Sequence, residues 1–178
     1  MRKHLYAIVF VLSAATLAAG FQQPQPWVKL SPPGGAFSVM MPTKPEESVE
    51  TKDSPLGKYT THLFITRAEG VIYIAGWVDY APGVKLDVRG EINANRDNFL
   101  KGVEAKATSE KEIRIDGHPG IEFTGESAKA LFKARVYLVR NRPYMVAAAW
   151  GVGQAEPPAV GTFLTSFALA KAARPGAD

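Results

Sequence analysis

The sequence predicts a single α+β domain, an α/β/α sandwich with a central antiparallel sheet. Segments that alternate apolar and polar residues follow one another between glycine, proline and asparagine turns, as in sheets built from hairpins. One long helical pattern interrupts these strands and a shorter one follows them, which predicts helices on both faces of the sheet. The composition, 46% hydrophobic and 21% charged, is that of an ordinary globular domain.

The first expected strand covers residues 36–41, where Phe37, Val39 and Met41 share one face and Pro42 ends the segment. Further strands are expected at residues 59–66, 71–78, 107–115, 131–139 and 143–150, with another arm around Ile121 and Phe123. This spacing of strands and turns is typical of a meander.

Two of these segments, residues 71–78 and 144–150, are apolar on both faces. In a sheet this means that both faces are covered, so the segment 71–78 is expected at the centre. The glycines in residues 116–120 permit a tight hairpin turn, and Asn141 is expected to adopt the left-handed conformation between the last two strands.

Residues 88–104 have the period of a helix that lies on the sheet. Its apolar stripe consists of Ile92, Phe99, Leu100 and Val103. The residues expected to point away from that stripe are Glu91, Arg96, Asp97 and Lys101. A second, shorter helix is expected from Pro157 to about Ser166, followed by an extended segment at 167–169.

Residues 1–20 have the pattern of a cleavable signal peptide. Arg2 and Lys3 precede an apolar run at residues 5–12, and small residues follow, with cleavage expected before Phe21. A retained membrane anchor is the alternative, but the apolar run is shorter than the roughly 20 residues needed to span a bilayer. We therefore expect an exported protein, periplasmic or extracellular, with no stable membrane span once the leader is removed.

After the leader we expect a flexible spacer at residues 21–35, one domain at 36–169 and a frayed tail at 170–178. The chain has no cysteine, which excludes disulfides, thiolate catalysis and cysteine-based zinc sites. The net charge is +4, and two of the positive charges belong to the leader, so the charge gives little support to nucleic-acid binding.

No motif demands a particular chemistry. His62 and His118 lie far apart without partners at metal-ligand spacing, and the glycines in residues 151–156 form an incomplete nucleotide loop. No nucleophile elbow is present, and Ser166 has no sign of an activating base. The carboxylate pairs Glu122 with Glu126 and Asp79 with Asp87 are interpreted as exposed polar faces. The sequence therefore predicts no catalytic residue, no metal ligand and no cofactor.

The most suggestive surface is basic. Lys133, Arg135 and Tyr137 alternate on one face of a strand, and Arg140 and Arg142 lie at its turn. Such a surface could bind an acidic partner, an anionic polymer or lipid headgroups. The alternative is that these cations only keep an exposed sheet face soluble.

Four short segments resemble the Mog1/PsbP-like superfamily, in particular its uncharacterised secreted bacterial domains. They are residues 37–42 with Pro45 after them, 115–123, 135–144 and 163–169. They consist of proline stops, glycine turns and core aromatic residues, and they contain no shared catalytic group.

The resemblance covers roughly residues 36–169 and implies an α/β/α sandwich with an antiparallel sheet. Known members mostly act as accessory or assembly factors that bind other proteins, and no functional residue is carried over from them.

We therefore expect an exported, non-enzymatic binding or accessory domain whose partner is another envelope or exported protein. The alternative is a small-ligand-binding protein, or a weakly marked hydrolase, with a pocket between the sheet and helix 88–104. A structural component of the envelope is a third possibility.

Overall fold

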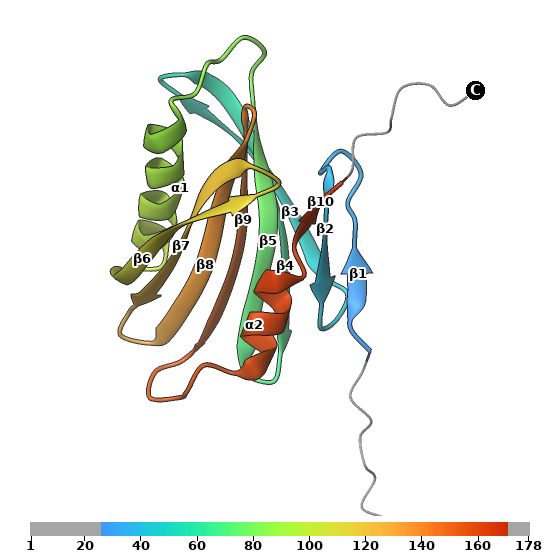
Figure 1. Cartoon of the computed structure of the whole chain (residues 1–178), viewed down its shortest axis with the longest axis vertical. Helices are drawn as coiled ribbons and strands as arrows, with labels where there is room; N and C mark the ends of the chain where they lie inside the picture. The colour runs from blue at the N-terminus through green and yellow to red at the C-terminus, as the bar shows by residue number, and fades with distance from the viewer. Residues whose placement is uncertain (1–25, 171–178) are drawn as a thin grey trace, which may run out of the picture.

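The computed structural model describes residues 26–170, so the predicted leader and nearly all of the predicted tail lie outside the described residues. The elements, in chain order, are β1 (Val28–Leu30), β2 (Phe37–Met41), β3 (Glu46–Ser54), β4 (Gly57–Ala68), β5 (Val71–Tyr80), α1 (Val88–Gly102), β6 (Lys106–Ile115), β7 (His118–Glu126), β8 (Ala130–Val139), β9 (Arg142–Gly151), α2 (Pro158–Thr165) and β10 (Ala168–Leu169). Figure 1 shows their arrangement.

The long strands form one seven-stranded antiparallel sheet in the order β3-β4-β5-β9-β8-β7-β6. β5 lies inside this sheet between β4 and β9, as the two apolar faces of residues 71–78 predicted. A second sheet of three short strands has the order β1-β2-β10. The fold is therefore α+β, with mostly antiparallel sheet and two helices.

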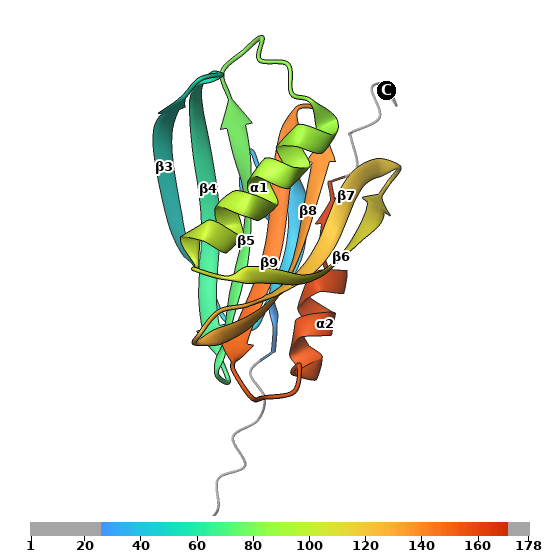
Figure 2. The same cartoon turned by 90° about the vertical axis from the view of Figure 1, so that its left-hand side faces the viewer.

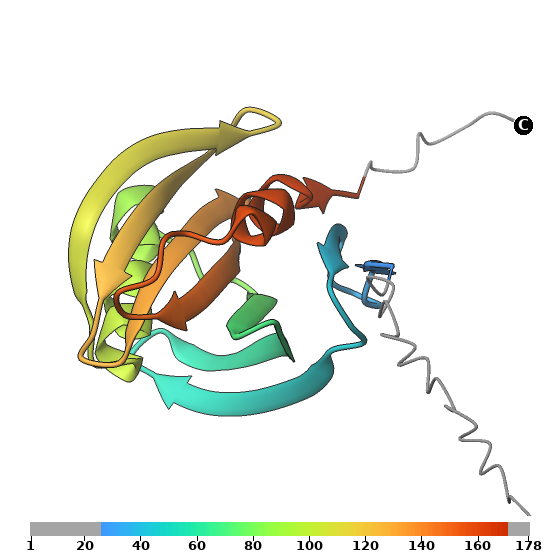
Figure 3. The ribbon, with the colours of Figure 1, turned by 90° about the horizontal axis from the view of Figure 1, so that it is seen from below.

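The two helices lie on opposite faces of the long sheet (Figures 1 and 2). Helix α1 packs on one face, where Ile92 and Leu100 join a core with side chains of β7, β8 and β9. Helix α2 lies on the other face together with the three-stranded sheet, as Figure 3 shows from below. The layer opposite α1 is thus partly β-structure, because β2 and β10 pair with each other beside α2.

The α2 face holds the larger apolar core. Trp77 and Trp150 are only 4% and 6% exposed there, and Phe163 of α2 is fully buried. Tyr73 contacts Phe163 edge to face, with ring centroids 5.1 Å apart. Burial of so many aromatic side chains is the main force that holds α2 and the small sheet on the long sheet.

Two strands were not expected from the sequence. β3 pairs with β4 along its whole length, yet almost all of its side chains are exposed, so no apolar alternation marks it. β1 lies in the segment expected to be a flexible spacer and pairs with β2, Val28 opposite Met41. Backbone hydrogen bonds, which leave no trace in side-chain pattern, define both strands.

The predicted tight turns are present, with one change. Asp116 and Gly117 join β6 to β7 and both have positive φ, 47° and 81°. In the turn from β8 to β9 it is Arg140, with φ 58°, that takes the left-handed conformation expected of Asn141. The side chain of Asn141 instead donates to the carbonyl of Val84 at 2.8 Å and so ties down the loop before α1.

Within residues 26–170, no helix is long and apolar enough to cross a membrane.

Candidate ligand-binding pocket

A cavity of about 700 Å³ lies between α1 and the half of the sheet formed by β4, β5 and β9. Its floor consists of Leu63, Ile74, Val78 and Met145, which all project from the α1 face of the sheet. Helix α1 crosses the sheet diagonally and leaves part of these strands uncovered (Figure 2). The pocket is the space along this uncovered part.

The burial pattern of β5 shows how incomplete the cover is. Tyr73, Ala75 and Trp77, on the α2 face, are at most 4% exposed. Ile74 and Val78, on the α1 face, are only half-buried. Apolar side chains of a central strand are therefore in contact with an open cavity instead of a packed layer.

The helix contributes the opposite wall. Phe99 and Val103 belong to the predicted apolar stripe of α1, yet they are half-buried and line the cavity, whereas Ile92 and Leu100 of the same stripe are buried. Part of the apolar stripe therefore extends beyond the strands against which α1 packs. The half-buried side chains Phe99 and Val103, together with the floor residues, make the pocket predominantly apolar.

One cluster of polar side chains lies at the wall of this pocket. Glu91, in the first turn of α1, is only 7% exposed. Its Oε1 accepts a hydrogen bond from the hydroxyl of Tyr80 at 2.6 Å and another from Nδ2 of Asn95 at 2.7 Å. The sequence pattern placed Glu91 away from the apolar stripe, and that expectation was wrong, because Tyr80 and Asn95 draw its side chain inward.

Burial of Tyr80, with its hydrogen bond to Glu91, raises the pKa of the Tyr80 hydroxyl well above its ordinary value. Tyr80 therefore keeps its proton and remains a donor to Glu91 throughout the neutral range. The sequence does contain a pattern that indicates this cluster. The polar residues Glu91, Asn95 and Asn98 follow one another at spacings of four and three, which places them on one side of α1.

A second hollow of similar volume lies between α1 and the β6–β7 hairpin. Four of its charged side chains form two ion pairs. Arg89 pairs with Glu112 at 2.9 Å, and Arg96 pairs with Glu110. Because these groups are already paired with one another, this hollow offers a ligand less than the apolar pocket does.

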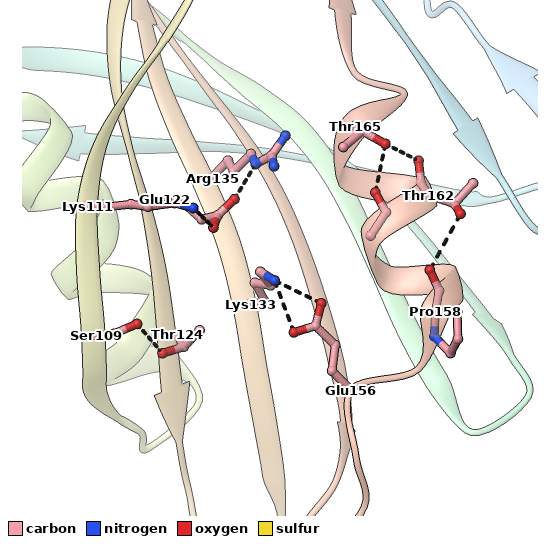
Figure 4. Close-up of polar contacts among 11 residues, drawn as sticks. Ser109, Lys111, Glu122, Thr124, Lys133, Arg135, Glu156, Pro158, Thr162 and Thr165 are labelled. Carbon is pink, nitrogen blue, oxygen red and sulfur yellow. Dashed lines mark hydrogen bonds and ion pairs between the residues drawn. The ribbon is translucent and has the colours of Figure 1, made fainter.

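The predicted basic surface lies on the α2 face of the sheet and is engaged in internal contacts. Arg135 donates from Nε to Glu122 at 2.7 Å and from Nη1 to the carbonyl of Leu164 in α2 at 3.0 Å. Lys111 of β6 reaches the other oxygen of Glu122 at 2.8 Å (Figure 4). Glu122, interpreted from sequence as part of an exposed face, is in fact 6% exposed.

Two other members of the basic set also have partners. Lys133 contacts both carboxylate oxygens of Glu156, at 2.9 and 3.0 Å (Figure 4). Tyr137 is 4% exposed and stacks on Phe167, with ring centroids 5.7 Å apart. The structure thus brings Lys133 and Arg135 onto one face, as expected, and covers the third residue of that stripe.

The two arginines at the β8–β9 turn differ. Arg142 pairs with Asp79 at 2.6 Å and donates to the carbonyl of Gly34 at 2.7 Å, so it joins the long sheet to the loop before β2. Arg140 is exposed. Asp79, interpreted from sequence as part of an exposed polar face, also accepts from the indole of Trp77 at 2.8 Å.

The two histidines stay far apart, as their positions suggested. His62 stacks on Trp77 with ring centroids 4.2 Å apart and lies 3.5 Å from Asp79, whereas His118 begins β7. In the part of the chain that the structure describes, no three potential metal ligands come together.

No protein-family model matches the sequence, and no curated protein matches it. Among solved structures, the solution structure of cyanobacterial PsbP (CyanoP) from Synechocystis sp. PCC 6803 is similar, with a TM-score of 0.56 over 85% of this chain and 97% of that chain. The chain has a PsbP-like fold. At 10% identity the likeness concerns the fold alone, so it supports the PsbP-like fold that the four short segments implied and nothing finer.

Proposed function

We propose that this protein is an exported, non-enzymatic binding domain that holds a small apolar ligand between α1 and the sheet. One observation carries the proposal: apolar residues of β4, β5 and α1 that a closed core would bury are only half-buried and line a cavity of about 700 Å³. Ligand sites in proteins are typically hollows of this size, mostly apolar, with a few polar groups that orient the ligand.

The polar groups of the pocket support binding more than turnover. Tyr80, Glu91 and Asn95 hydrogen-bond to one another, and the raised pKa of Tyr80 keeps its hydroxyl protonated. A nucleophile must lose its proton to react, and the raised pKa of Tyr80 opposes that loss. Here the hydroxyl is committed to Glu91, which suits an orienting role.

The pocket is tested by titrating the protein with 1-decanol and following backbone amide shifts by NMR. We expect the largest shifts on the pocket side of α1, at Ala94, Asn98 and Gly102. An Ala94→Trp variant, whose indole extends into the cavity, should bind at least tenfold more weakly. Ala128→Trp is the matched control, because Ala128 is also exposed but lies in the β7–β8 loop.

Unchanged amide shifts along α1 at saturating decanol would refute the pocket as a ligand site. Equal loss of binding in the Ala94→Trp and Ala128→Trp variants would do the same, since only the first substitution alters the cavity.

Binding of an exported protein partner is the second proposal, and Arg140 is the observation that favours it. This residue is exposed at the β8–β9 turn, whereas Lys133, Arg135, Tyr137 and Arg142 all make internal contacts. Reversal of its charge in Arg140→Glu should remove a partner captured from the native envelope without changing the unfolding midpoint. Retention of every captured protein by this variant would count against the basic surface.

A further inference from the structure

We infer that the ligand of this pocket carries one ammonium group, which binds the carboxylate of Glu91, on an elongated apolar body. The inference rests on the proposed function, namely that the pocket is a ligand site, and adds the charge and shape of the ligand. We argue this inference from Glu91, from Tyr80 and from the apolar floor of the pocket.

One carboxylate oxygen of Glu91 accepts no hydrogen bond from the described residues. Both hydrogen bonds from Tyr80 and Asn95 end on Oε1. Within residues 26–170, no buried side-chain oxygen or nitrogen lacks a hydrogen-bond partner, so Oε2, which accepts none, must be accessible. Glu91 lines the pocket, so we take the accessible Oε2 as the acceptor for a bound molecule.

Within the described part of the chain, the negative charge of Glu91 lacks the basic partners that another buried carboxylate, Glu122, has. Glu122, equally buried at 6%, has Lys111 and Arg135 within 2.8 Å. Glu91, at 7%, has no basic side chain within ion-pair distance among the described residues. The N-terminal turn of α1 stabilises a carboxylate only partially, and Asp87 already caps that end through the amide of Gly90. A buried carboxylate still lacks a full counter-charge, which a cation in the pocket would supply.

The other residues that line the pocket are also compatible with a positively charged group on the ligand. Among the described residues that line this pocket, Glu91 is the only carboxylate and none is lysine, arginine or histidine. Tyr59 and Tyr80 pair with ring centroids 5.9 Å apart at the same wall. Aromatic faces attract ammonium groups, so the rings add to the attraction of the carboxylate.

The length of the pocket indicates that the ligand has an elongated apolar body. The lining follows α1 from Glu91 to Val103, a length of about 18 Å at the rise of an α-helix. The carboxylate lies toward one end, and Phe99 and Val103 lie toward the other. A ligand with its charged group at one end and an apolar chain of several ångströms behind it fits this polarity.

Three probes of one chain length test the inference by calorimetric titration below their aggregation limits: decylammonium, 1-decanol and decyl sulfate. We expect decylammonium to bind at least tenfold more tightly than decanol, because its positive charge strengthens a hydrogen bond to Glu91 that the hydroxyl of decanol can also donate. Decyl sulfate should bind most weakly. Glu91→Gln should reduce the affinity for decylammonium to that for decanol, whereas Glu47→Gln, the same change on exposed β3, should leave it unchanged.

The outcomes separate the two proposals. If none of the probes binds, the pocket itself is refuted. If decanol or decyl sulfate binds as tightly as decylammonium to the unaltered protein, or Glu91→Gln leaves the preference intact, the ammonium group is refuted while the apolar pocket stands. The comparison of probes on the unaltered protein needs no variant to fold.

Discussion

Glu122 lies between two basic side chains on the α2 face of the sheet, and its ionisation should govern part of the acid stability. Burial alone would raise the pKa of Glu122, but hydrogen bonds from Lys111 and Arg135 outweigh it and hold the pKa below its ordinary value. The unfolded value is about 4.3. The carboxylate therefore stabilises the fold above that pH, and the contribution is lost as the pH falls through the lower, folded pKa.

Glu122→Gln should accordingly lower the free energy of unfolding at pH 7 by about 2 kcal/mol, as expected for charge-assisted hydrogen bonds. The difference from the unaltered protein should shrink as the pH falls below about 4. Urea titrations at pH 7 and pH 3 measure both values. Glu126→Gln, on the same strand but exposed, is the control. A deficit of the same size at both pH values would contradict the ionic role.

The two arginines of the β8–β9 turn should differ sharply in their effect on stability. Arg142→Ala removes the arginine that pairs with Asp79 and leaves the carbonyl of Gly34 without its donor, so we expect a loss of about 2 kcal/mol. Arg140→Ala should change the free energy of unfolding by less than about 0.5 kcal/mol. Chemical denaturation of both variants tests this. Equal losses would mean that Arg142 acts through the turn conformation and not through its ion pair.

At the scale of elements, the junction between α2 and β2 depends on one hydroxyl. Ser166, just after α2, donates to the carbonyl of Phe163 at 2.7 Å and accepts from the amide of Met40 at 2.9 Å. The sequence shows no activating base for this serine, and in the structure its hydroxyl bridges α2 and β2. Residues 126 positions apart in the chain are joined here.

Ser166→Ala should therefore destabilise the protein by about 1–2 kcal/mol, because the half-buried amide of Met40 loses its partner. Hydrogen exchange at Met40 should accelerate more than at the centre of β5. Thr165→Ala is the matched control, since the hydroxyl of Thr165 is exposed and bonds only carbonyls of its own helix. Unchanged exchange at Met40 would contradict the bridge.

Elements with a strong side-chain pattern were predictable, and elements held by backbone pairing alone were not. β5 and β9 are apolar on both faces, which identified them as strands between covered faces. β3 is a charged edge strand, so its sequence resembles a loop, and charges on an edge discourage further pairing. The extended segments expected at 36–41 and 167–169 contain β2 and β10, but their pairing with each other and with β1 was not predicted, because β1 and β10 have only three and two residues.

The candidate site was predictable only in outline. A pocket between the sheet and helix 88–104 was one of the alternatives drawn from sequence, and the cavity lies there. Its polar residue was missed, because Glu91 lies beside Ile92 on the helix and its direction depends on Tyr80, eleven residues earlier. The basic residues were found, but the carboxylates that pair with them come from other elements and from a loop that periodicity cannot place.

For the molecule as a whole, the expected cleavage of the leader decides which elements of the fold the exported chain retains. Cleavage before Phe21 would retain β1 and also Trp27, whose ring contacts Tyr73 edge to face at 5.7 Å. Every described element, from β1 to β10, would then be present in the mature chain. The predicted leader and the observed fold are compatible on this point.

We expect the full chain, expressed in a bacterium, to accumulate outside the cytoplasm with Phe21 as its first residue, which mass spectrometry of the purified protein measures. A chain expressed from Phe21 onwards is the reference for the stability measurement. A chain starting at Ser31 lacks β1 and Trp27 and should lose about 2 kcal/mol, since it gives up a strand pairing and an aromatic contact on the larger core. Equal stability of the two truncated chains would show that residues 21–30 act as a spacer after all, and a retained Met1 in the exported fraction would refute the cleavage.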